Sequence, residues 1–201
     1  MVGLDVNDGM LAVARAASDR LPIEWALADA AALPLPDAAF DAVVCQLGLQ
    51  FVADRPAAVR EMHRVSVTGA RVAIGLFGSI RRAPGYVALA AGLDRHLGTE
   101  AGDVIRSIFL ESGTAAQRAL LEAAGFRDVH VRIEPSSGRY PSAAEFLRQE
   151  AASSPLARPV ASLAARDRDA LVAEVEDALA DCIDDDGVVL PLEIWIVTAR
   201  R

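Results

Sequence analysis

The chain has 201 residues, 53% of them hydrophobic, and a formal net charge of −8 at pH 7. This length suits one domain, or one domain with a helical insertion, and is enough to bury a sizeable core. The acidic balance argues against a nucleic-acid interface, which needs a basic face. No apolar run approaches the roughly 20 residues of a membrane helix, and the residues after Met1 lack the basic and apolar regions of a secretion signal. We therefore expect a soluble, cytoplasmic protein without a nucleic-acid or membrane partner, and leave a homo-oligomer open.

The cysteines and the basic residues carry little chemistry. Cys45 lies in an apolar run and Cys182 in an acidic one, so they form neither a disulfide framework nor a metal-ligand spacing. All 20 basic residues are arginine, which suggests a GC-rich bacterial genome. No metal site is expected.

Short apolar runs alternate with longer amphipathic stretches, a pattern typical of a parallel sheet covered by helices. We expect strands at 2–5, 23–28, 40–46, 70–77, 128–134 and 192–199. Helices are expected at 7–18, 55–64, 84–97, 114–124 and 167–183. Residues 136–186 should form loop and helices, with Pro155 and Pro159 as breakers. Residues 184–187 (Asp-Asp-Asp-Gly) indicate a turn rather than a cation site, because an EF-hand's other ligands are missing.

Two carboxylates follow the first two strands, at the sheet edge where ligands bind in open parallel sheets. Asp5 could accept hydrogen bonds from a ribose diol, or it could only help cap the next helix. Asp29 could accept from the amine of adenine while the Ala30 amide donates to the ring, or it could be a turn carboxylate. Val6 and Met10 could supply apolar surface to a purine, although Met10 could equally be helix core. These residues form a candidate nucleoside site.

No nucleophile, base or metal constellation accompanies these carboxylates. Gln46 ends the third strand, either as a functional group or as a polar stop, and Asp41 near the start of that strand is more typical of a structural role. His63 beside Arg64 favours packing and hydrogen bonding over catalysis, and the other two histidines are far apart in sequence. We single out no catalytic residue.

Several stretches, in their order along the chain, resemble the class I S-adenosylmethionine (SAM)-dependent methyltransferases of the methyltransferase type 11 (UbiE-like) family. They are Val2–Asp5, Met10–Leu11, Ala28–Ala30 with Leu33–Pro34, Phe40–Val44, His63–Val65 and Gly69–Arg71. The resemblance implies a Rossmann-like α/β sheet with an antiparallel terminal strand at 192–199. It also implies one methyltransferase-like domain over 1–201, with helical, lid-like insertions at 79–110 and 136–186 that choose the acceptor.

The resemblance further implies which residues meet the cofactor SAM and the methyl acceptor. The cofactor set is Asp5, Val6, Met10, Asp29, Ala30, Gln46 and Leu47. Phe51, Phe77 and Tyr86 are expected where a small-molecule acceptor could stack, with a purely structural role in the core as the alternative. Methyl transfer from a sulfonium needs mainly alignment and exclusion of water, so no catalytic triad is expected.

The chain departs from the family pattern at the methionine end of SAM. The family's first strand, which is central in its sheet, and the glycine-rich loop after it have no counterpart here, because none of the 14 glycines forms a G-x-G-x-G run. We expect an N-terminally incomplete methyltransferase with deficient SAM binding. A non-catalytic remnant that serves as an interaction module is the alternative, and a nicotinamide-dependent oxidoreductase is disfavoured by the later strands. An in-frame upstream segment encoding a strand and G-x-G-x-G would favour the enzyme.

Overall fold

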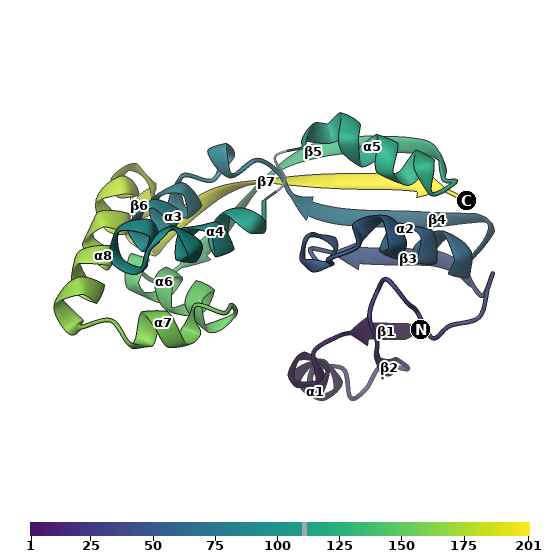
Figure 1. Ribbon diagram of the computed structural model, residues 1–201, viewed down its shortest axis with the longest axis horizontal. Coiled ribbons are helices and arrows are strands. Elements are labelled where there is room, and N and C mark those ends of the chain that lie inside the picture. Colours follow the sequence, from purple (N-terminus) through teal and green to yellow (C-terminus); the bar gives the residue numbers. More distant parts are fainter. Residues whose placement is uncertain (110–111) are drawn as a thin grey trace. The chain divides into compact units, whose positions relative to one another are not determined.

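The strands of the computed structural model, which describes residues 1–109 and 112–201, form two sheets in these residues (Figure 1). β1 (Val2–Asp5) and β2 (Glu24–Leu27) pair in parallel, with Asp5 opposite Leu27. The larger sheet has the strand order β3-β4-β7-β5, and β6 pairs antiparallel with β7. Its strands are β3 (Phe40–Gln46), β4 (Ser66–Phe77), β5 (Arg127–Tyr140), β6 (Ile183–Asp184) and β7 (Gly187–Arg200).

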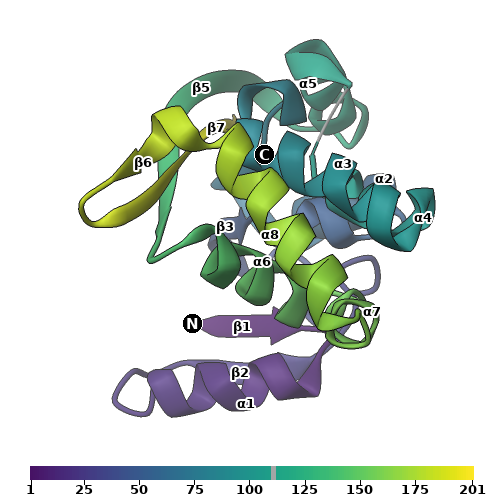
Figure 2. The ribbon, with the colours of Figure 1, turned by 90° about the vertical axis from the view of Figure 1, so that its left-hand side faces the viewer.

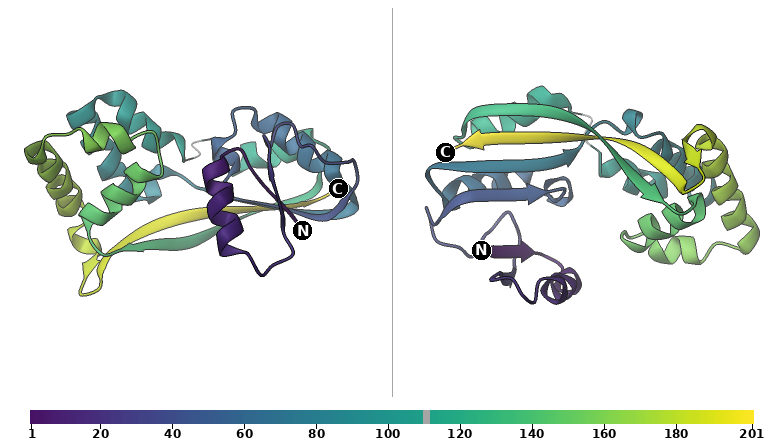
Figure 3. Two further views of the ribbon diagram at one scale, coloured as in Figure 1. Left: turned by 90° about the horizontal axis from the view of Figure 1, so that it is seen from below. Right: turned by 180° about the vertical axis from the view of Figure 1, so that it is seen from behind.

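The terminal strand runs against both of its long neighbours. In Figures 1 and 3, β3, β4 and β5 point one way and β7 points the other. β7 is bonded to β4 on one side and to β5 on the other. The antiparallel terminal strand expected at 192–199 is therefore confirmed.

The chain divides into two compact units, which are described separately. The first unit contains residues 1–74, 114–131 and 197–201, and the second contains 75–113 and 132–196. Within these ranges, β4, β5 and β7 each contribute residues to both units. Leu110, the last residue of the insertion expected at 79–110, lies outside the described residues.

In the first unit, α1 (Asp8–Ala17) packs on the β1-β2 pair. Asn7 caps α1 by accepting a hydrogen bond from the Met10 amide, as its N-terminal position predicts. The Trp25 ring lies over Gly3, so close that an added Cβ would stand 2.3 Å from it, and its Nε1 donates to Ser18 Oγ (3.0 Å). Glycine at position 3 is therefore what lets α1, β1 and β2 close together.

Two more helices, α2 (Arg55–Val65) and α5 (Gly113–Ala123), cover one face of the larger sheet in this unit (Figure 3). The side chains of β3 alternate. Val43 and Cys45 are partly buried, while Val44 is 72% exposed. One face of β3 thus remains open to solvent in the described residues.

The second unit has a helical core of its own (Figure 2). Its helices are α3 (Pro84–Leu97), α4 (Thr99–Ser107), α6 (Ala143–Ala152), α7 (Ala157–Ala161) and α8 (Ala165–Ala178). Among its buried side chains, Leu93, Phe146 and Leu171 are fully enclosed. α3 packs against both α4 and α8.

Several expected bounds are corrected by the structure. β5 continues to Tyr140, through residues expected to be loop, and β4 begins earlier, at Ser66. Pro135 is tolerated because β5 is an edge strand, where a missing N–H need not break a ladder. Pro159 does not break a helix. It lies in the first turn of α7, where the lost N–H has no helical partner.

Candidate functional site

Asp5 ends β1 and turns its carboxylate to the edge where the next segment begins. Its Oδ1 accepts a hydrogen bond from the Asn7 amide (2.8 Å), and its backbone oxygen accepts from Ala28 (3.0 Å). Oδ2 has no hydrogen-bond partner among the described residues. The first contact belongs to the turn before α1, as the capping alternative requires. The second oxygen leaves an acceptor for a ligand hydroxyl, so both interpretations of Asp5 stay open.

Asp29 lies at the same edge, after the neighbouring strand β2. Its Oδ1 accepts from the Ala31 amide (2.8 Å) and its backbone oxygen from Ala32 (3.0 Å), which is the turn geometry of the alternative interpretation. Within the described chain the Ala30 amide has no acceptor, although the next two amides, those of Ala31 and Ala32, both donate to Asp29. The structure therefore brings Asp5, Asp29 and a donor at Ala30 to neighbouring strand ends.

Apolar side chains adjoin these carboxylates. Val6 is 73% exposed and Met10 is 57% exposed, whereas Leu11 is completely buried. The alternative that Met10 belongs to the helix core is therefore wrong. Exposed apolar surface beside Asp5 is what a purine would need, and binding of a purine there remains a prediction.

The end of β3 carries a strained backbone. Gln46 is exposed, and Leu47 has a φ of +50°, a conformation costly for a side chain with a Cβ and frequent at functional sites. Gln50, only 5% exposed, donates from Nε2 to the Leu47 oxygen (3.1 Å), while its Oε1 has no partner in the described part of the chain. Phe51 is 66% exposed. Sequence reasoning missed Gln50, since nothing in its local pattern marks it as buried.

The other two candidate acceptor residues, Phe77 and Tyr86, lie in an aromatic cluster of the second unit. Their ring centroids are 6.5 Å apart, and each packs against Phe109. Tyr86 is 4% exposed and donates its hydroxyl to Glu150 (3.0 Å), as does Tyr140. Burial raises the pKa values of Tyr86 and of the Glu150 carboxyl. Tyr86 thus has the core position of the alternative interpretation, and its contact with an acceptor remains a prediction.

The histidines form no catalytic constellation. His63 packs edge-on against Phe126, with ring centroids 5.0 Å apart, and burial lowers its pKa. His96 contacts Glu174 in the second unit, and His130 is exposed. No group of three or more metal-ligating side chains occurs in the part of the chain that the structure describes.

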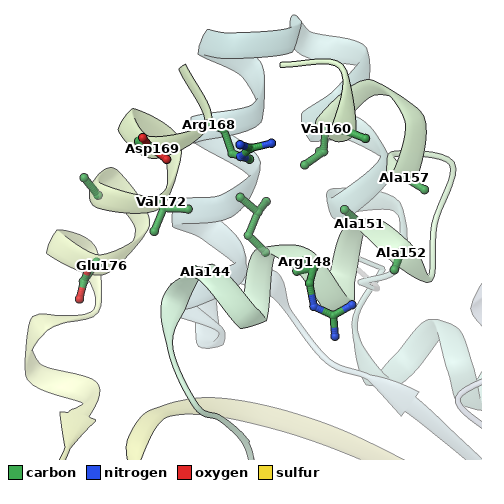
Figure 4. A pocket seen from close by; sticks show the side chains of 13 residues that line it. Ala144, Arg148, Ala151, Ala152, Ala157, Val160, Arg168, Asp169, Val172 and Glu176 are labelled. Carbon is green, nitrogen blue, oxygen red and sulfur yellow. The ribbon is translucent and has the colours of Figure 1, made fainter. Parts of the chain in front are cut away.

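A cavity of about 630 Å³ opens between α6, α7 and α8 (Figure 4). Its walls are mainly alanine, leucine and valine side chains, with four charged residues: Arg148, Arg168, Asp169 and Glu176. Arg148 is paired with Glu145. The volume suits a small molecule, but none of the residues expected to bind cofactor or acceptor lines it.

The contacts of Glu61, which lie beside the predicted site, were not predicted from the sequence. Glu61 accepts a hydrogen bond from the Leu33 amide (2.8 Å) and is paired with Arg64. The signal that could have found it is an acid three residues before a base at a helix end. None of the described helices combines the length and the apolar character that crossing a membrane requires.

Part of the chain is similar in sequence to known methyltransferases. A methyltransferase domain family matches residues 1–74. The 2-phytyl-1,4-naphtoquinone methyltransferase of Thermosynechococcus vestitus is 45% identical over 75 residues, which are 37% of this chain and 33% of that protein. A demethylmenaquinone methyltransferase of Thermus thermophilus is 38% identical over 92 residues, covering 41% of this chain and 42% of the relative. The aligned segments thus span only about a third to two fifths of these relatives.

Solved structures extend the likeness in fold to the whole chain. The YcgJ protein of Bacillus subtilis has a TM-score of 0.63 at 15% identity, covering 100% of this chain and 81% of that one. Phosphoethanolamine N-methyltransferase 2 of Haemonchus contortus, solved with S-adenosylhomocysteine, has a TM-score of 0.56 at 18% identity and covers 100% and 43%. Residues 1–74 thus match a methyltransferase domain family and resemble SAM-dependent methyltransferases of the UbiE-like type, while the chain as a whole is similar to methyltransferases in fold.

Proposed function

We propose that this chain performs SAM-dependent methyl transfer to a small-molecule acceptor, with the adenosine of SAM bound at the carboxyl ends of β1 and β2. The observation that carries the proposal is that a carboxylate acceptor and a backbone donor lie near each other at that edge. Asp5 Oδ2 can accept from a ribose hydroxyl, and the Ala30 amide can donate to the adenine ring. Both groups lack a partner in the described residues. The exposed Val6 and Met10 supply the apolar contact.

The residues present fit the adenosine half of SAM better than its methionine half. SAM supplies an electrophilic methyl group on a sulfonium, so the protein has to bind, orient and exclude water. Asp5 and Ala30 would orient the nucleoside. Gln46 and the strained Leu47, after β3, are the proposed neighbours of the methionine part.

No G-x-G-x-G run meets the methionine carboxylate and amine, so we expect the 201-residue chain alone to bind SAM weakly. Losing three or four charged hydrogen bonds of about 1.5 kcal/mol each would move a micromolar ligand beyond millimolar. The same observation favours a second candidate function, an interaction module with a methyltransferase fold and no turnover. Detectable methyl transfer by this chain would exclude the second candidate.

Candidate methyl acceptors can be compared directly in activity assays. Two relatives carry quinone-type substrates in their names, which makes quinols the first acceptors to test. The matched segments, however, lie mostly in the first unit, whereas the proposed acceptor contacts Phe77 and Tyr86 lie in the second. Acceptor choice therefore does not follow from the match.

The cofactor site is tested by replacing its central carboxylate. Asp5→Asn should weaken SAM binding by about 1.5 to 3 kcal/mol, the range for a hydrogen bond to a charged group, which is roughly 10- to 150-fold. Asp29→Asn should cost less, because its proposed partner is a single amine. Asp41→Asn is the matched control, since that carboxylate is exposed on β3. Because binding to the wild-type chain is itself expected to be weak, an NMR chemical-shift titration with a large excess of SAM ranks the affinities of the three variants. Equal affinities for the Asp5 and Asp41 variants would refute the site.

A further inference from the structure

The segment that follows β2 is fastened to the end of α2 by two charged side chains and by backbone hydrogen bonds. Residues 28–39 join β2 to β3 without helix or strand. Glu61 and Arg64, one turn apart on α2, together make the contacts that hold this segment, and we call them the Glu61–Arg64 clasp.

Arg64 reaches three residues of the segment at once. Its Nη2 donates to the Leu33 oxygen (3.0 Å), and its Nη1 donates to the Leu35 oxygen (2.8 Å) and to Asp37 Oδ1 (2.6 Å). A planar guanidinium can make these bonds together because its donors point outward in one rigid plane. A lysine ammonium, with a single nitrogen, could not reach all three.

Glu61 contacts both Arg64 and the segment. Its two oxygens accept from Arg64 Nε (2.7 Å) and Nη2 (2.8 Å), and Oε2 also accepts from the Leu33 amide (2.8 Å). The backbone of α2 adds two bonds farther along, from Ala38 to the Arg64 oxygen and from Ala39 to the Val65 oxygen. Both charged side chains are partly buried, so solvent screens this pair less than a surface pair.

The clasp lies directly beside the predicted adenine contacts. The Asp29 turn closes through the amides of Ala31 and Ala32, and Leu33 is the next residue. On its other side, the turn is joined to β1 by the bond from Ala28 to Asp5. The direction of the Ala30 amide is thus fixed by one anchor at β1 and one at the clasp.

We infer that the Glu61–Arg64 clasp is a positioning device, which holds residues 29–37 so that Asp29 and the Ala30 amide face a bound adenine. This inference rests on the proposed function, since it assigns the device to the adenosine site. Neither side chain of the clasp is among the proposed contacts to the ligand. Its effect should be on affinity for the nucleoside, through the order of the segment.

Amide hydrogen exchange and adenosine titration test the inference together. In Arg64→Lys, exchange at Ala31, Ala32 and Leu33 should speed up at least about tenfold, while exchange in β4 stays unchanged, because the segment opens locally. Affinity for adenosine should fall about tenfold, the loss expected for one charged hydrogen bond. Arg60→Lys is the matched control, since Arg60 is exposed on the same helix, and it should change neither quantity.

A graded pair of variants distinguishes positioning from general stabilisation. Glu61→Gln keeps an oxygen for the Leu33 amide and should restore much of the protection that Glu61→Ala loses. If exchange rises equally in β4, the clasp only supports the whole fold, and the inference is wrong. Unchanged exchange at Leu33, or unchanged adenosine affinity despite faster exchange, would also overturn it. If the wild-type protein binds no adenosine, the proposed function fails, and the exchange data still decide whether the clasp orders residues 29–37.

Discussion

Glu150 shows how burial changes the chemistry of a single residue. Its carboxylate accepts hydrogen bonds from Tyr86 and Tyr140 in the second unit. Burial raises its pKa, and the two phenol donors lower it by less. The folded protein therefore favours the protonated carboxyl more than the unfolded chain does, and ionisation of Glu150 works against folding.

This preference predicts how stability depends on pH. Because the folded pKa is above the unfolded value of about 4.5, the contribution of Glu150 is fully present below that pH and is lost as the pH rises through the folded pKa. Glu150→Gln cannot ionise and still offers an oxygen to both phenols. The free energy of unfolding of this variant, relative to wild type, should increase from pH 4.5 upward and then level off. The total increase should be about 1.4 kcal/mol for each pH unit by which burial raises the pKa of Glu150. Urea unfolding across pH 4 to 8 measures this, with Glu176→Gln at an exposed site as control. A difference that does not change with pH would show that Glu150 is not strained by burial.

At the predicted site, the sequence indicates where polar residues lie better than it indicates what those residues do. Asp5, Asp29 and Ala30 could be placed from the sequence, because the carboxyl ends of neighbouring parallel strands share an edge. The burial of Tyr86 could not be predicted, since an aromatic side chain after a strand has the same local pattern in a core and in a pocket. The bonds of Arg64 to Leu33 and Leu35 depend on tertiary structure and leave no periodic signal.

Among the elements, α5 ends where a glycine turns the chain. Gly125 has a φ of +98°, and an added Cβ would stand 3.1 Å from His63 Nε2. The His63 ring has little room to yield, because it packs against Phe126. The turn between α5 and β5 therefore depends on glycine for two reasons, backbone conformation and close approach.

Alanine substitutions at two glycines separate the cost of the backbone conformation from the cost of the close contact. Gly69 in β4 also has a positive φ (+82°), but nothing lies within 4 Å of its added Cβ. Gly69→Ala should cost about 1 to 2 kcal/mol, the cost of a left-handed backbone with a Cβ. Gly125→Ala should cost about 1 kcal/mol more, because His63 has to move. Urea unfolding of both variants gives the difference, and equal costs would mean that the His63 contact contributes nothing.

Element type was easier to predict than element length. All six expected strands exist, and α3 has the expected bounds of Pro84–Leu97. β5 is longer than expected because pairing with β7 overrides the weak strand propensity of 135–139. Cooperative pairing at a distance, unlike local periodicity, is not visible in a short window.

On the scale of the whole molecule, the strands form two sheets in the described residues. The antiparallel β7 between β4 and β5 is present, and β1-β2 forms a separate sheet in the described residues. The two compact units divide most of the proposed roles, with the acceptor residue Phe51 in the first unit as the exception. The first unit holds every proposed contact to SAM, whereas Phe77 and Tyr86 belong to the second.

The most direct measurement is a chemical-shift map of adenosine binding on the isotopically labelled chain. Adenosine lacks the methionine part, so its binding reports only on the edge formed by β1 and β2. The amides of Val6, Met10, Ala30 and Ala31 should shift together along one binding curve, with a dissociation constant of about a millimolar or weaker. Asp5→Asn should abolish these shifts. Shifts confined to other residues, or none at saturating adenosine, would contradict a nucleoside site at this edge.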